Sequence, residues 1–199
     1  SYEAALHSYL HVGDVSDAGL VGLRGATYLD ATETGFPPRL QEPEAVTFGE
    51  RPVDRVYYSD SSVQLRDAVL GRVVYIVKSG SPQTVVWNPG KEGDHMRCAR
   101  PGEWRGFVAV EAAACRDRGV TLAPGESHTL SQTLSVETLD VDDARRRGMP
   151  PPMTVRPRSS RAGLTVDARR FSGFRRSPGR RSRVRAAPGR IAGPVRIVE

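Results

Sequence analysis

Short runs of apolar or alternating residues, separated by turn residues, occupy the chain from residue 12 to residue 139. In SVQLRD, at 62–67, the apolar residues Val63 and Leu65 alternate with polar ones. Alternation with a period of two is typical of a β-strand that buries one face. HTLSQTLSVETL, at 128–139, shows the same alternation over a longer stretch.

The same reading predicts strands in several further runs. They are VTFG (46–49), DRVYYS (54–59), RVVYIVK (72–78), TVVWN (84–88) and GFVAVEAA (106–113). The sequences between them, such as GFPPR, SGSP, NPG and APGE, are rich in the residues that form tight turns. No segment of a dozen residues carries a helical apolar stripe. We therefore expect an all-β protein, with an antiparallel β-sandwich or a large part of one.

The composition changes near Asp143. Residues 144–199 hold 16 of the 29 Lys and Arg residues but only two acids, a net charge of +14. Residues 1–143 hold 13 basic and 21 acidic residues, a net charge of −8. The overall charge of +6 thus averages two unlike parts, and it carries no information about partners of the part with strand patterns.

The basic part, residues 144–199, is rich in Arg, Pro and Gly and poor in apolar residues. Such a segment buries too little surface to offset its chain entropy, so we expect a disordered tail after a domain at 1–143. Three interpretations stay open: a tail without function from a shifted reading frame, an arm that binds nucleic acid nonspecifically through phosphates, and a folded module. A nucleic-acid partner is otherwise not expected.

The chain has two cysteines, Cys98 and Cys115, and they do not form a Cys-x-x-Cys pair. We interpret both as thiols in a reducing compartment. No apolar run approaches the roughly 20 residues of a membrane helix, and the N-terminal residues lack the pattern of a signal peptide. These features predict a soluble, cytoplasmic protein without a membrane partner.

Two histidines, His7 and His11, lie four residues apart in ALHSYLHVGD, at 5–14. A helical zinc motif would place a glutamate at Ser8, which argues against a metal pair on a helix. On a strand, residues four apart share a face but lie roughly 13 Å apart, too far for one ion. From the residues alone, each histidine is a surface or core residue, or a catalytic acid.

Four motifs together resemble one family. ALHSYLHVGDV is followed by VDRVYY (53–58), VVWNPG (85–90) and FVAVEAA (107–113). In this order and spacing they resemble the hexose-6-phosphate mutarotases, also called glucose-6-phosphate 1-epimerases, of the galactose-mutarotase-like superfamily. The resemblance covers residues 1 to about 140. It implies a large β-sandwich with a sugar site on the concave face of one sheet.

The resemblance also implies an activity and a set of site residues. The expected reaction interconverts the α and β anomers of a hexose 6-phosphate, with no metal or other cofactor. The resemblance gives His7 the role of general acid and Glu111 that of general base. It makes Asp54 a ligand of sugar hydroxyls, and it places Asn88 and Trp87 near the substrate. Histidine suits the acid role because its ordinary pKa is about 6.5.

Each of these residues also has a structural interpretation. Glu111 lies between Val110 and three alanines, which could desolvate the carboxylate and raise its pKa, but it could equally face solvent. Asp54 could form a surface ion pair with Arg55, and Trp87 could be a core aromatic residue. His11 is expected to be structural or to lie behind the site.

Relatives in this family are longer, and their phosphate-binding arginines lie mostly before the histidine segment. The chain begins about five residues before that segment, so we expect the C-terminal part of such an enzyme, with weakened binding of the phosphate. Two alternatives from other classes are a noncatalytic carbohydrate-binding β-domain and a nucleic-acid-binding basic tail on a β-scaffold.

Overall fold

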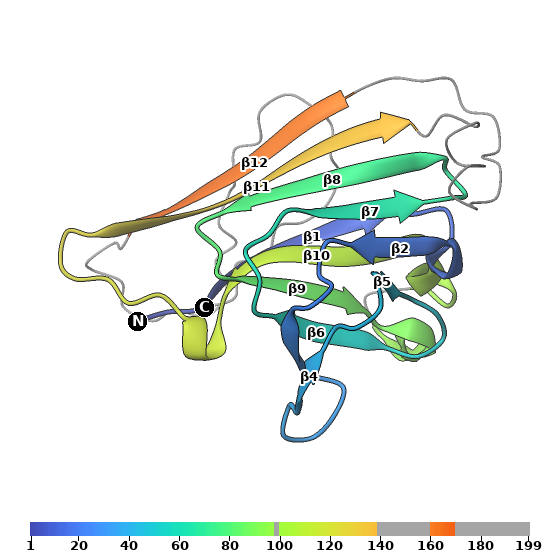
Figure 1. Ribbon diagram of the computed structural model, residues 1–199, viewed down its shortest axis with the longest axis horizontal. Coiled ribbons are helices and arrows are strands. Elements are labelled where there is room, and N and C mark those ends of the chain that lie inside the picture. Colours follow the sequence, from blue (N-terminus) through green and yellow to red (C-terminus); the bar gives the residue numbers. More distant parts are fainter. Residues whose placement is uncertain (98–99, 139–159, 170–199) are drawn as a thin grey trace.

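The computed structural model describes residues 1–97, 100–138 and 160–169, and it shows two six-stranded sheets packed face to face (Figure 1). The first sheet has the order β1-β10-β9-β6-β3-β4. Its strands are β1 (Ala4–His11), β10 (Phe107–Ala114), β9 (Gln83–Asn88), β6 (Val53–Tyr57), β3 (Thr27–Asp30) and β4 (Pro38–Leu40).

The second sheet has the order β12-β11-β8-β7-β2-β5. Its strands are β12 (Ser160–Arg169), β11 (Ser127–Thr138), β8 (Arg72–Ser79), β7 (Val63–Asp67), β2 (Ala18–Val21) and β5 (Ala45–Thr47). Every pairing between these strands is antiparallel. The expected all-β class and antiparallel β-sandwich are therefore confirmed.

Helical structure in the described residues is limited to four short 3-10 turns. They are Val15–Asp17, Gly90–His95, Glu103–Gly106 and Arg116–Arg118. No helix among these residues is long and apolar enough to span a membrane.

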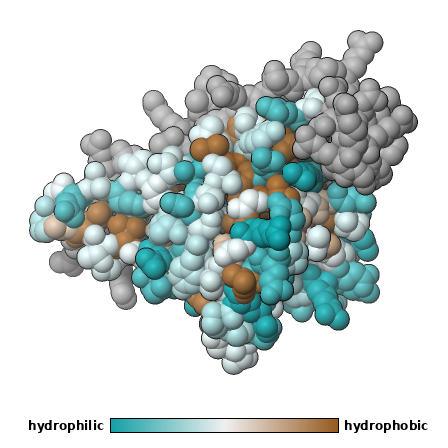
Figure 2. Space-filling view, viewed as in Figure 1, coloured by the Kyte–Doolittle hydropathy of each residue, from teal (hydrophilic) through white to brown (hydrophobic). Residues whose placement is uncertain are grey.

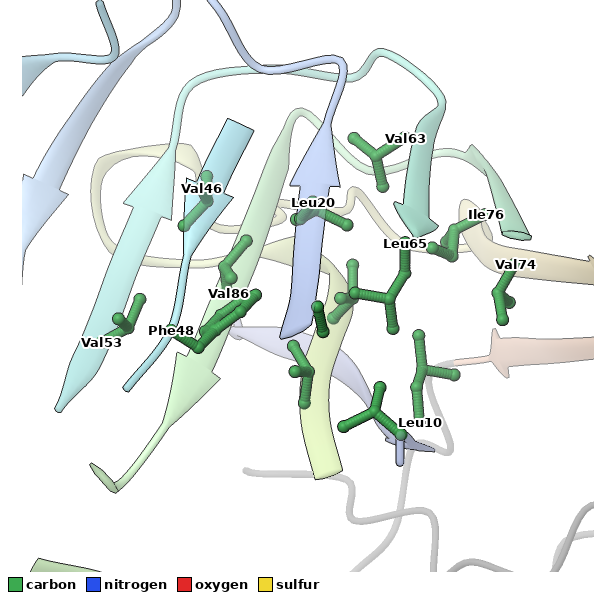
Figure 3. Packing of buried hydrophobic residues seen from close by; sticks show 14 of the residues in the cluster. Leu10, Leu20, Val46, Phe48, Val53, Val63, Leu65, Val74, Ile76 and Val86 are labelled. Carbon is green, nitrogen blue, oxygen red and sulfur yellow. The ribbon is translucent and has the colours of Figure 1, made fainter. Parts of the chain in front are cut away.

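The hydrophobic core lies between the sheets and uses the alternate positions that the sequence pattern marks. In β7, Val63 and Leu65 are fully buried, while the alternating polar residues Gln64 and Arg66 are half-buried. They belong to the same cluster of buried side chains as Val86 and Val53 of the first sheet (Figure 3). Each such side chain stabilises the fold by about 1.5–3 kcal/mol through removal of its apolar surface from water.

On the surface of the molecule, hydrophilic and hydrophobic residues are mixed. Hydrophilic residues cover most of the lower right of the view in Figure 2, and hydrophobic residues reach the surface in its middle. This mixture is ordinary for a protein surface, where scattered apolar residues need no special explanation.

One strand lies where the sequence predicted disorder. Within residues 144–199 the structure describes β12, which pairs along its length with β11. The sequence SRAGLTVDAR has apolar residues at the alternate positions 162, 164, 166 and 168, a period-2 pattern that its arginine-rich surroundings obscure. The other residues of that stretch, and with them the end of the domain at 143 and the proposed nucleic-acid arm, lie outside the described residues, as does Cys98.

A buried lysine connects the two sheets at one end of the sandwich. The Nζ atom of Lys78, on β8, donates to the carbonyl oxygen of Ser61 at 2.7 Å and to Oγ1 of Thr84 on β9 at 2.6 Å. Lys78 is 9% exposed, and burial lowers the pKa of its amine to about 8, against the opposing charge of Asp60. The fold therefore binds this proton more weakly than the unfolded chain does.

Replacement of Lys78 by Met is expected to remove a pH dependence of stability. In the wild type the unfolded state keeps the proton between pH 8 and about 10.5, so the free energy of unfolding rises by up to about 3 kcal/mol over that range. Lys78→Met lacks this rise. Urea denaturation at pH 7.5 and pH 10 measures it, with the exposed Lys91→Met as matched control. Equal pH slopes in the wild type and Lys78→Met would contradict the burial of the amine.

Candidate active site

The two residues expected to be acid and base lie directly opposite each other on neighbouring strands. In the antiparallel ladder of β1 and β10, His7 pairs with Glu111. Nε2 of His7 is 3.3 Å from Oε1 of Glu111. Successive residues of a strand point to opposite faces, and Leu6 and Leu10 are buried in the core, so both site residues lie on the outer face of the first sheet.

The backbone under this pair is fixed by a buried glutamine from the other sheet. Oε1 of Gln132, on β11, accepts a hydrogen bond from Oγ of Ser8 at 2.8 Å. Nε2 of Gln132 donates to the carbonyl oxygen of Val110 at 2.9 Å. Ser8 follows His7 and Val110 precedes Glu111, so one side chain ties both strands to the core next to the pair. Such support keeps reacting groups in a fixed geometry.

Glu111 is held in surroundings that disfavour its charge. Its side chain is only 7% exposed, and it pairs across the ladders with His7 on β1 and Val85 on β9. Burial raises the pKa of the carboxyl to about 8, and the negative charge of Asp54 adds to the rise. The direction is the one that the apolar neighbours in the sequence predict.

The pair can hold and exchange a proton near neutral pH. A carboxyl group with a pKa of about 8 binds a proton there, and the His7 ring lies within reach to take it. His7 is 21% exposed at its side chain, so the pair is accessible from the outer face. Such an arrangement provides one acid and one base side by side.

Asp54 and Trp87 lie on the same face, one row along the strands from the pair. In the ladder of β6 and β9 they are opposite each other, and Trp87 also pairs with Ala109 of β10. The centroid of the Trp87 ring is 5.9 Å from that of His7, with the ring planes at 75°. Both residues are half-buried. Trp87 is thus not a core residue, which leaves its ring available at the site.

The alternative interpretation of Asp54 as the partner of Arg55 is wrong. The two residues follow each other on β6 and point to opposite faces. Arg55 donates to Oε1 of Gln41 at 3.2 Å, on the core side. Burial raises the pKa of Asp54, the guanidinium of Arg116 opposes the rise, and Asp30 adds to it. Asp54 is therefore a half-buried carboxylate on the site face.

Comparison with known proteins identifies the family of the chain. Residues 1–135 match the family described as aldose 1-epimerase.

The chain belongs to the aldose 1-epimerase family.

Curated relatives of this epimerase-family chain carry one name, "Putative glucose-6-phosphate 1-epimerase". The protein of Cenchrus ciliaris is 34% identical over 129 residues, which is 63% of this chain and 38% of the relative. The protein of Escherichia coli K12 is 30% identical over 140 residues, 67% of this chain and 45% of the relative. The chain therefore spans less than half the length of these relatives.

Two solved structures share the fold. One, from Salmonella typhimurium, is described as "a putative mutarotase" and superimposes with a TM-score of 0.56 at 27% identity, over 68% of this chain and 45% of the other. The structure of HI1317 superimposes with a TM-score of 0.57 at 23% identity, over 68% and 46%, and it supports the fold alone. The epimerase-family chain thus has the mutarotase-like sandwich expected from its sequence.

Asn88 of the epimerase-family chain has a position different from that of the other expected site residues. It is fully buried, and Nδ2 donates to the carbonyl oxygens of Trp104 at 2.9 Å and Phe107 at 2.8 Å. Oδ1 accepts from the backbone N–H of Gly90 at 2.9 Å. Gly90 has φ of +57° and lies against the backbone of Glu50, where a Cβ would collide. The Asn88 side chain thus holds the turn after β9 and the start of β10.

Sequence reasoning did not single out two further residues beside the site. Tyr9 lies two positions after His7 on β1, and its ring stacks on the imidazole at 4.6 Å between centroids. Arg116 follows β10, and its guanidinium lies 3.8 Å from the centroid of the Phe36 ring and acts on Asp54. The period-2 pattern could have identified Tyr9, because residues i and i+2 share a face.

His11 has a structural contact, in line with the expectation from sequence. Its Nδ1 lies 2.9 Å from the carbonyl oxygen of Gly106, just before β10. This contact joins the end of β1 to the turn that begins β10. His11 thereby supports the register that places His7 opposite Glu111.

Proposed function

We propose that this chain catalyses the interconversion of the α and β anomers of a hexose 6-phosphate, with His7 as general acid and Glu111 as general base. The observation that carries the proposal is the 3.3 Å contact of the two side chains on the outer face of a sheet, together with the raised pKa of the buried carboxyl. Membership in the aldose 1-epimerase family supports it.

The reaction needs one proton donor and one proton acceptor at the same carbon. The reaction starts with the shared proton of the pair on His7, to which Glu111 has passed it. The carboxylate of Glu111 then removes the proton of the C1 hydroxyl while the His7 imidazolium protonates the ring oxygen. The bond between C1 and the ring oxygen breaks, and an open-chain aldehyde forms. After rotation about the bond between C1 and C2, His7 takes back the proton and Glu111 returns its proton to the carbonyl oxygen as the ring closes. At the end of the reaction, His7 and Glu111 have regained their initial protonation states.

The neighbouring residues suit a sugar. Asp54 is a half-buried carboxylate one row from the pair and can accept hydrogen bonds from sugar hydroxyls. The ring of Trp87 lies opposite it in the ladder and offers an apolar surface to the C–H groups of a pyranose. Asn88 is engaged by three protein hydrogen bonds, so we propose that it shapes the site without contacting the substrate.

The 6-phosphate in the proposal comes from the relatives, which are named for glucose 6-phosphate. On the described part of the chain, Arg116 is a cation close enough to act electrostatically on Asp54. An arginine can bind a phosphate through two parallel hydrogen bonds.

The proposal is tested by exchange NMR on pure anomers. The purified chain is expected to accelerate the exchange between α- and β-glucose 6-phosphate, and to act about tenfold less on unphosphorylated glucose and galactose. A hydrogen bond to a charged group contributes about 1.5–3 kcal/mol, and about 1.4 kcal/mol corresponds to a factor of ten. No acceleration with any of these sugars from a folded chain would reject an epimerase. Binding of the sugars without acceleration would instead favour a carbohydrate-binding domain.

A further inference from the structure

Tyr9 and His7 form a stacked pair of rings on β1. Their centroids are 4.6 Å apart and the ring planes make an angle of 21°. Residues two apart on a strand share a face and are spaced by about 7 Å, so the two side chains lean toward each other to reach this distance. An offset stack of this kind is a favoured geometry for aromatic rings.

Tyr9 is itself held by other rings. The ring of Phe107, on β10, meets it at 5.3 Å between centroids and 67° between planes. The ring of Trp87, on β9, meets it at 6.2 Å and 86°. Both contacts are edge-on, so rings from two other strands contact Tyr9 and restrict the orientation of its ring.

Ala109 makes this arrangement possible. It is the residue of β10 that lies opposite Tyr9 on one side and opposite Trp87 on the other. Its side chain is a single methyl group and is fully buried. The rings of Tyr9 and Trp87 can therefore meet above it, although their strands are not neighbours.

The stack has an electrostatic consequence for His7. The face of an aromatic ring carries partial negative charge and attracts a cation within about 6 Å of the centroid. The protonated imidazole is such a cation, whereas neutral imidazole gains little. Stacking on Tyr9 therefore favours the state in which His7 carries the proton and Glu111 is the carboxylate, which is the starting state of the proposed reaction.

The other groups around His7 act on the same proton. Glu111 faces it from β10, and β9 presents the uncharged residues Val85 and Trp87. Asp54, on β6, acts on Glu111, and is in turn acted on by Arg116 and Asp30. These carboxylates and the arginine also influence whether the proton lies on His7 or on Glu111. They are unchanged in a variant that replaces Tyr9 alone.

We propose that Tyr9 is a positioning residue, which holds the His7 imidazole with Nε2 toward Glu111 and favours the proton of the pair on His7. The proposal rests on the proposed function of His7 as acid. It concerns a property of the free protein, however, so it can be measured without any substrate.

The test compares Tyr9→Leu and Tyr9→Phe with the wild type by NMR of the histidine rings, with His7 assigned through His7→Gln. Tyr9→Leu is expected to lower the midpoint of the His7 titration by about half a pH unit, because an exposed cation–π contact is worth about 0.5–1 kcal/mol and one unit is 1.36 kcal/mol. Tyr9→Phe keeps the ring and is expected to retain the wild-type midpoint. The matched control is Tyr58→Leu, at a half-buried tyrosine just after β6 whose ring centroid lies 5.8 Å from the guanidinium of Arg118.

In exchange NMR with glucose 6-phosphate, Tyr9→Leu is expected to lower kcat about tenfold with little change in KM, and Tyr9→Phe to restore it. Tyr9 is 38% exposed, so the loss of its ring is compatible with folding, and Tyr9→Thr replaces Tyr9→Leu if that variant does not fold. An unchanged His7 midpoint in a folded variant without the Tyr9 ring would overturn the proposal. A wild type without epimerase activity would reject the proposed function. The His7 titration in the Tyr9 variants would still test the positioning role of Tyr9, because it needs no substrate.

Discussion

Glu111→Gln is expected to slow the exchange of glucose 6-phosphate anomers by about 10²–10⁴-fold, which is the usual contribution of a general base. The amide keeps the size of the side chain and can still contact His7, 3.3 Å away, but it cannot accept the proton of the C1 hydroxyl. The loss should fall on kcat with KM little changed, because the substrate's other contacts remain. Exchange NMR at saturating substrate measures it.

The same substitution is expected to stabilise the fold in alkaline solution. The pKa of Glu111 is about 8 in the fold against 4.5 in the unfolded chain, so the wild type loses stability as the pH rises between these values. The Gln variant has no such loss. Its free energy of unfolding should exceed that of the wild type by a few kcal/mol at pH 9, and the difference should shrink toward pH 4.5.

Urea denaturation at pH 5 and pH 9 checks this prediction, with Glu42→Gln at an exposed position as the control. A Glu111→Gln variant that is inactive but no more stable than the wild type at pH 9 would show that the fold does not raise the pKa of the Glu111 carboxyl. The proposed base would then lack the property that suits it to its role.

Asn88→Ala is expected to destabilise the fold by roughly 3–5 kcal/mol. The substitution leaves the carbonyl oxygens of Trp104 and Phe107 and the N–H of Gly90 without their partner, and each unpaired buried group costs about 1–3 kcal/mol. Chemical denaturation of the variant measures the loss. The fraction that remains folded should keep the wild-type KM, since the side chain points into the protein.

Asn88→Asp sharpens the test because it retains the acceptor for Gly90 and loses both donors. Asn88→Asp is also expected to destabilise the fold and to leave KM unchanged. A mild loss of stability in both variants together with a raised KM would contradict the structural role and would instead make Asn88 a ligand of the substrate.

The sandwich could be predicted from the sequence because its strands bury one face. Val63 and Leu65 in β7 show the alternation directly, and the apolar run at 72–78 falls within β8. β2, β3 and β4 have only three or four residues each, too few for a period of two to stand out. β12 has the alternation, but the basic residues around it favoured disorder instead.

The candidate site could be predicted only through the resemblance to a family. His7 and Glu111 are 104 positions apart, and no local pattern determines that β1 pairs with β10 in the register that joins them. The tie through Gln132 is likewise a contact between sheets. The motif VVWNPG led us to expect substrate contacts from both Trp87 and Asn88, but alternation places these neighbours on opposite faces, the ring at the site and the amide in the core.

The central claim is that His7 and Glu111 act together as one acid–base unit, and a double-mutant cycle on anomer exchange tests it most directly. Exchange of glucose 6-phosphate anomers is measured by NMR for the wild type, His7→Gln, Glu111→Gln and the double variant. We expect each single variant to fall to a similar residual rate and the double variant to be no slower, because groups that act as a unit are not additive. Full activity in either single variant, or losses that multiply in the double variant, would contradict the claim.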